Sequence, residues 1–166
     1  MRMSEEEFRL FCAKTGQSPF NYQVPKQSKP SKSPKYRNKK VYVYKDGFVS
    51  TGEKLESHGK PKDIFDSVRE YNRWCELVLM QKANLISNLS RQEVLVIQSA
   101  FERNGEKIRA IEYKADHSYT KNGQQIIEDV KGFNEREQRH INLTKDFKLK
   151  WKLLKQLYPN KIFQIY

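Results

Sequence analysis

The stretch that decides the fold is YKADHSYTKNGQQIIEDVKG, residues 113–132. Aromatic and β-branched residues predict one strand from Tyr113 to Tyr119 and a second from Gln125 to Lys131. Asn122-Gly123 between them is a typical two-residue hairpin turn, and Gly132 marks the end of the second strand. The stretch therefore predicts two adjacent antiparallel strands.

Two aspartates and a lysine lie on these strands. Side chains alternate along a strand, so Asp129 and Lys131 share one face, and pairing of the strands places Asp116 beside Asp129. Two carboxylates suit a hard cation such as Mg²⁺ or Mn²⁺. The cation would polarise a phosphate and activate water, while the lysine stabilises charge or orients the nucleophile. An ordinary solvated strand face is the alternative, because Asp-x-Lys is common in proteins.

Composition indicates a polyanionic partner. The length of 166 residues suits one domain with a modest extension. The net charge of +12 and the pI of about 9.6 point to a polyanionic partner, most simply nucleic acid. A basic ribosome-like or packaging protein would share this charge. Cys12 and Cys75 stand alone, which predicts free thiols in a reducing compartment and no structural zinc. The sequence shows neither a membrane-length apolar run nor a signal peptide, so we expect a cytoplasmic protein without membrane contact.

Residues 1–34 are expected to form a separate arm. A short helix with Phe8 and Phe11 is predicted first, followed by a proline-rich linker. The basic stretch after it predicts phosphate contacts, although a solvated tether would have the same composition. The expected DNA-binding residues are Lys26, Lys29, Lys32, Lys35, Arg37, Lys39 and Lys40.

Residues 35–166 are expected to form one domain. A hairpin is predicted around Asp46-Gly47 and a loop over 51–62. The elements that follow are a helix over 67–82, a strand over 93–98, the two motif strands, a helix over 144–157 and a strand over 161–166. The last strand is apolar enough to lie inside a sheet. The core order is therefore α-β-β-β-α-β, with a parallel unit formed around the second helix.

This order resembles the restriction-endonuclease-like core of the PD-(D/E)xK nucleases, a mixed α/β sheet flanked by helices. Residues 35–166 more narrowly resemble the phage endonuclease I family, which are Holliday-junction resolvases. The resemblance depends on the motifs Lys35 to Lys40, Phe65-Asp66-Ser67 leading to Glu70, Leu79 to Ser87, Tyr113 to Asp116, and Glu128 to Gly132. The stretch from Gly47 to Asp63 is longer than the family pattern and could be an added DNA-contacting loop.

The resemblance implies roles for individual residues. Asp116 and Asp129 would bind the metal, and Lys131 would lie near the attacking water. Glu70 is at the place of the family's third carboxylate, although it could instead act only as a helix cap, and Glu76 is the fallback. Alternation puts Glu128 on the other strand face, away from Lys131.

His117 follows Asp116 where the family often has an aromatic or apolar residue. It is expected to point away from Asp116 and to be a partly buried packing residue, with a catalytic-base role as the alternative.

The resemblance implies an Mg²⁺- or Mn²⁺-dependent endonuclease that cuts branched DNA, such as four-way junctions, as a homodimer. If the chain is phage-encoded, its compartment is the cytoplasm of the host bacterium. The alternatives are a nicking or general duplex DNA endonuclease of the same fold, and a non-catalytic basic DNA-binding protein. Candidate dimer contacts are the Phe8/Phe11 helix and the hairpin with Tyr42, Tyr44 and Phe48.

Overall fold

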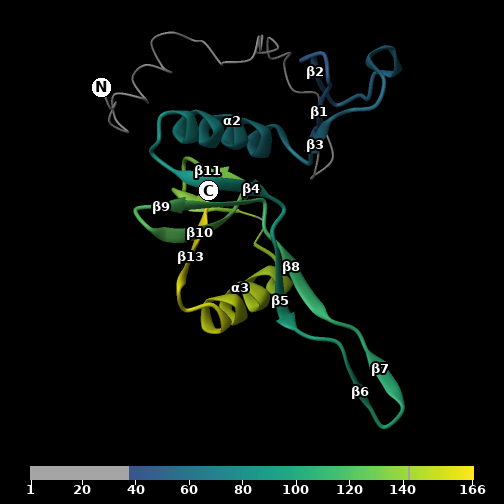
Figure 1. Cartoon of the computed structure of the whole chain (residues 1–166), viewed down its shortest axis with the longest axis vertical. Coiled ribbons are helices and arrows are strands. Elements are labelled where there is room, and N and C mark those ends of the chain that lie inside the picture. The colour runs from purple at the N-terminus through teal and green to yellow at the C-terminus, as the bar shows by residue number, and fades with distance from the viewer. Residues whose placement is uncertain (1–37, 142) are drawn as a thin grey trace. The chain divides into compact units, whose positions relative to one another are not determined.

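The computed structural model describes residues 38–141 and 143–166, which form two α-helices and several small sheets (Figure 1). The fold class is mixed α/β, which confirms the coarse part of the prediction. The chain divides into two compact units, Met1–Leu79 and Met80–Tyr166. The predicted arm, with its helix, lies outside the described residues. Within the described ranges, no helix is long and apolar enough to cross a membrane.

The first unit contains a three-stranded antiparallel sheet in the order β2-β1-β3. β1 (Val41–Val43) and β2 (Val49–Thr51) form the predicted hairpin, and Gly47 in its turn has a φ of 86°, which favours glycine. β3 (Asp63–Phe65) was not predicted and pairs with the other edge of β1. The predicted loop over 51–62 contains one turn of 3-10 helix, η1 (Glu56–His58).

Helix α2 (Val68–Lys82) confirms the helix predicted over 67–82. Its start is capped in both directions. The Glu70 amide donates to Ser67 Oγ at 3.0 Å, and Glu70 Oε2 accepts from the Asp66 amide at 3.0 Å. Glu70 is 6% exposed, so this reciprocal capping orders a buried carboxylate in the first turn.

The second unit is built on a four-stranded sheet in the order β13-β10-β9-β4. β9 and β10 are antiparallel, and Asn122 and Gly123 between them have φ values of 51° and 79°, which confirms the predicted hairpin turn. β10 and β13 are parallel and connected through α3, as predicted. The bounds are Ser87–Arg91 (β4), His117–Lys121 (β9), Gln124–Asp129 (β10), Lys145–Leu157 (α3) and Lys161–Ile165 (β13).

β13 is an edge strand of this sheet, so the prediction that it lies inside a sheet is wrong. Its apolar residues pack on α3 instead of between two neighbouring strands. Phe163, for example, meets the Trp151 ring edge-on at 5.4 Å. An apolar strand that is covered on one face by a helix resembles a central strand in sequence.

Helix α3 carries the predicted apolar stripe. Thr144 caps it, since its Oγ1 accepts from the Phe147 amide at 3.1 Å. Phe147, Trp151 and Leu154 are buried, and they pack with Ile127 of β10 in one core cluster. This core therefore lies between α3 and one face of the sheet.

The strand predicted from Tyr113 to Tyr119 is broken at Ala115 and Asp116. Its first half is β8 (Ile111–Lys114), which pairs with β5 (Val94–Gln98) in a separate two-stranded ribbon. The main sheet therefore takes β4 as its fourth strand, in place of the strand predicted over 93–98. Two further ribbons were not predicted. They consist of β6 (Phe101–Arg103) with β7 (Glu106–Ile108), and β11 (Phe133–Asn134) with β12 (Arg139–His140).

Candidate active site

The break before β9 brings Asp116 to the end of β10. His117 pairs with Glu128 in the sheet, so the residues next to this pair, Asp116 and Asp129, lie at the same end of the two strands. Asp116 Oδ2 accepts a hydrogen bond from the Val130 amide at 2.7 Å. The structure thus brings together the two aspartates that were predicted to meet.

Asp129 is a buried carboxylate, with 3% of its surface exposed. Its Oδ1 accepts a hydrogen bond from the Tyr113 hydroxyl, and its Oδ2 forms an ion pair with Lys131 Nζ. Within the described part of the chain, Oδ2 is a buried oxygen to which no hydrogen bond is assigned. One oxygen is therefore fixed by Tyr113, while the other is directed at positive charge.

Tyr113 was not among the predicted site residues. Burial raises the pKa of its phenol far above the ordinary value, and the negative charges of Asp129 and Asp116 raise this pKa further. The phenol thus stays protonated and donates at neutral pH, and both carboxylates act on it. Sixteen residues separate Tyr113 from Asp129, so no local spacing pattern predicts the contact.

Lys131 lies two residues beyond the end of β10, which was predicted to continue through it. Its amide donates to the carbonyl of Tyr166 at 3.0 Å, so the backbone there is still anchored to the C-terminal residue. Nζ lies 4.6 Å from the centre of the Phe147 ring in the first turns of α3. The ammonium is therefore held between a carboxylate and an aromatic face.

The oxygens at this site suit Mg²⁺ or Mn²⁺, which prefer carboxylates. Asp116 and Asp129 would hold the ion, because they lie at the same end of the two paired strands. Within the described ranges no group of three or more His, Cys, Asp or Glu side chains is arranged to hold a metal. Glu70 belongs to the first unit, and its role as third ligand stays a prediction. The same holds for Glu76, which forms an ion pair with Arg73 at 2.9 Å.

The other strand face carries a buried polar cluster. His117 is fully buried, whereas a partly buried packing residue was predicted, and its Nδ1 lies 3.7 Å from Glu128 Oε1. Glu128 is fully buried too, and its Oε2 accepts from the Tyr119 hydroxyl at 3.0 Å and from Gln164 Nε2 at 2.6 Å. Glu128 was expected only to point away from Lys131. These cross-strand partners show that it links β9, β10 and β13.

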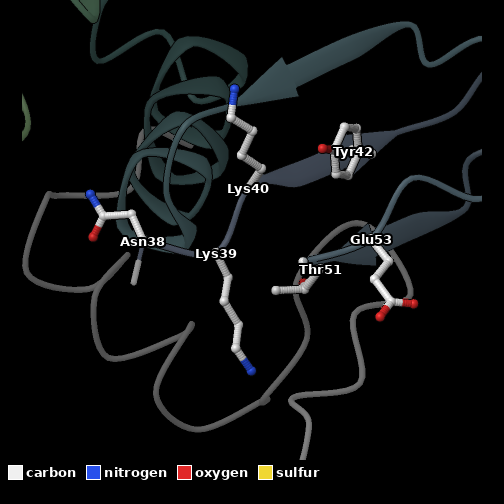
Figure 2. Close-up of a pocket in the computed structure, with 7 residues that line it drawn as sticks. Asn38, Lys39, Lys40, Tyr42, Thr51 and Glu53 are labelled. Atoms are coloured by element: carbon white, nitrogen blue, oxygen red, sulfur yellow. The ribbon is translucent and has the colours of Figure 1, made fainter. Parts of the chain in front are cut away.

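The predicted DNA-binding residues fall mostly before residue 38. Lys26, Lys29, Lys32, Lys35 and Arg37 lie outside the described residues. Lys39 and Lys40 are exposed and line an open cavity of about 420 Å³ together with Tyr42 and Thr51. Figure 2 shows the two lysine side chains pointing in opposite directions, and Lys40 Nζ lies 3.2 Å from Asp66 Oδ1. Contact with DNA stays a prediction for all seven residues.

Most of the chain matches one recognised sequence family. Residues 33–165 match the family model described as "Protein of unknown function (DUF1064)", and the chain is a member of this family. Neither the curated proteins nor the solved structures contain a match to the chain.

Proposed function

We propose that this protein is a metal-dependent DNA endonuclease that hydrolyses phosphodiester bonds. The observation that carries the proposal is the position of Asp116 and Asp129 at the same end of two paired strands, with the Lys131 ammonium held against Asp129. Two carboxylates and an adjacent lysine form the minimal set for metal-assisted attack of water on a phosphate.

The order of elements supports a restriction-endonuclease-like core. If the small ribbons β5 to β8 and β11 to β12 are left aside, the sequence α2, β4, β9, β10, α3 and β13 is compatible with an α-β-β-β-α-β core, with β4 in the place of the strand predicted over 93–98. The parallel pair of β10 and β13 around α3 fits the same layout. This order supports the resemblance to the phage endonuclease I family and its PD-(D/E)xK site.

Each side chain has a role in the proposed chemistry. A bound Mg²⁺ or Mn²⁺ would polarise the scissile phosphate and lower the pKa of a water molecule. Asp116 and Asp129 would bind the ion, and Tyr113 orients Asp129 by holding its Oδ1. Lys131, whose side chain is 24% exposed and whose ammonium is held over Phe147, would stabilise the charge of the phosphate or orient the attacking water. Glu70 is proposed as the third carboxylate.

The proposed substrate is branched DNA such as a four-way junction. A net charge of +12 supports a nucleic-acid partner, and the resemblance supplies the branch preference. One acidic pair per chain cuts one strand, so resolving a junction requires two copies related by a two-fold axis. A duplex-nicking enzyme of the same fold is the second candidate, and a DNA-binding protein without catalysis is the third.

A single cleavage experiment separates the three candidates. The full-length protein is incubated with a four-way junction and with linear duplex of the same sequence, each with and without Mg²⁺. Asp129→Asn tests the site. Asp146→Asn is the matched control, because Asp146 is an exposed aspartate on α3 whose carboxylate lies 3.6 Å from Lys150.

The resolvase proposal expects two opposed nicks in the junction, dependent on Mg²⁺ and on Asp129 but not on Asp146. Equal cutting of linear duplex would favour the nicking enzyme. Binding without cutting, under all conditions, would favour the third candidate. Full activity of the Asp129 variant would contradict the assigned site.

A further inference from the structure

The ribbon of β5 and β8 buries one face and exposes the other. Leu95 and Tyr113 form a cross-strand pair that lies in the core cluster with α3. The Tyr158 hydroxyl also donates to the carbonyl of Val96 at 2.9 Å, which fixes the ribbon to the end of α3. Val94 and Val96 alternate with Leu95 and are 51% and 40% exposed. The outer face of this anchored ribbon therefore presents two β-branched apolar side chains.

The ribbon continues into β6 and β7, as Figure 1 shows. Among the described strands, these two pair only with each other. Phe101 stands opposite Ile108 and remains 46% exposed, although it is a large aromatic residue. A two-stranded hairpin is marginally stable in water unless a further partner covers it. We define residues 94–114 as the projecting ribbon.

The charge of the ribbon tip indicates what covers it. β6 and β7 carry two acids and two bases, with Glu102 opposite Lys107 and Arg103 opposite Glu106. The tip is therefore neutral in a chain whose net charge is +12. A polyanion gains nothing from a neutral tip. A second copy related by a two-fold axis can pair the acids of one tip with the bases of the other, and each such pair then forms twice.

We propose that the projecting ribbon is the surface through which two copies of this chain associate. Val94, Val96 and Phe101 supply the apolar contacts, and the charges of β6 and β7 supply the complementarity. The hairpin with Tyr44 and Phe48 offers less, because Tyr44 is 1% exposed and one face of Phe48, which is 43% exposed, is stacked on His58 at 4.1 Å. Association through the ribbon does not depend on the proposed nuclease activity. If the chain is a resolvase, this interface provides the pair of catalytic centres.

Sedimentation velocity of the full-length chain at micromolar concentration tests the interface. The wild type is expected to sediment as a dimer. Phe101→Glu should weaken the dimer by on the order of 30-fold or more, because it puts a charge into the apolar contact. Leu149→Glu is the matched control: Leu149 on α3 is 60% exposed and lies outside the ribbon, so this variant should dimerise normally. Far-UV circular dichroism verifies that both variants are folded.

Charge reversal provides a second test that does not depend on apolar truncation. Glu102→Lys gives the tip an excess of positive charge, and Lys107→Glu gives it an excess of negative charge. Each variant alone should be monomeric, whereas an equimolar mixture should form heterodimers. Two copies that touch elsewhere would dimerise in every case, and this result would overturn the proposal.

Two further outcomes would also overturn it. A wild-type chain that stays monomeric throughout, with variants that only lose DNA affinity, would make the ribbon a DNA contact. A monomer that dimerises only after residues 1–37 are removed would mean that the N-terminal segment covers the ribbon. Nuclease activity is not read in any of these measurements, so failure of the interface and failure of the proposed function remain distinguishable.

Discussion

Tyr113→Phe is the substitution that tests how the candidate site is organised. The Tyr113 hydroxyl donates to Asp129 Oδ1, and both groups are buried. A hydrogen bond to a charged group contributes about 1.5–3 kcal/mol, so the variant should lose about that much stability. Without the phenol, Asp129 can turn its carboxylate about the Lys131 ion pair. Loss of such a supporting bond typically weakens metal affinity by about 10–100-fold.

The assay measures stability and metal binding on the same protein. Urea unfolding gives the loss of stability, and Mn²⁺ electron paramagnetic resonance gives the metal affinity without any cleavage reaction. Tyr119→Phe is the matched control, because the Tyr119 hydroxyl donates at 3.0 Å to the buried Glu128 on the other strand face. This control should lose stability but bind Mn²⁺ as the wild type does. Equal Mn²⁺ affinity in wild type and Tyr113→Phe would refute the assigned role of the phenol.

Three further predictions concern the two aspartates, the arm and a partly buried ion pair. Asp116→Asn and Asp129→Asn should each reduce cleavage at least about 100-fold, while junction binding measured by gel shift stays equal or tightens, because negative charge near the phosphates is removed. Near-normal cleavage in either variant would point to another site. Deletion of residues 1–34 removes Lys26, Lys29 and Lys32, and should flatten the slope of log affinity against log salt by roughly 0.9 for each lost phosphate contact. An unchanged slope would mean that the arm does not touch DNA. Burial alone would raise the pKa of Glu93, but the hydrogen bond from Lys161 at 2.8 Å and further hydrogen bonds outweigh it and hold this pKa below the ordinary glutamate value. The stability from this pair is therefore complete above the ordinary glutamate pKa and is lost as pH falls through the lowered one. Urea midpoints of Lys161→Met should fall less between pH 6 and pH 3 than those of the wild type, and parallel curves would contradict the assignment.

Local signals in the sequence predicted the elements that depend on neighbouring residues. Asn122-Gly123 tolerates positive φ, so the hairpin of β9 and β10 was predictable from two residues. The stripe of Phe147, Trp151 and Leu154 has helical spacing, and Thr144 caps the same helix. The Asn122-Gly123 turn and the alternation of side chains along the two strands were both visible in the sequence. The position of Asp116 near Asp129 was therefore also predictable.

Contacts between distant segments decided the rest. At Ala115 and Asp116 the chain leaves the ribbon of β5 and β8 and enters the main sheet. There the Ala115 amide donates to the Glu93 carbonyl at 2.9 Å, and the Gln92 amide donates to the Asp116 carbonyl at 3.1 Å. These bonds continue the pairing of the two segments across the break, where Gln92 has a φ of 57°. The segment before the break is β4, which pairs with β9 in the main sheet although its polar sequence does not look like a strand.

The candidate site divides in the same way. The sequence by itself determined which charged residues share a strand face, because alternation depends only on the backbone. Only the tertiary structure decided which other side chains contact these charged residues. Tyr113 reaches Asp129 from another sheet, and Phe147 reaches Lys131 from a helix that follows it in the chain. Burial of Glu128 beside His117 likewise required three strands to come together. Side-chain direction is a local property, whereas burial and partner choice depend on packing between segments far apart in the sequence.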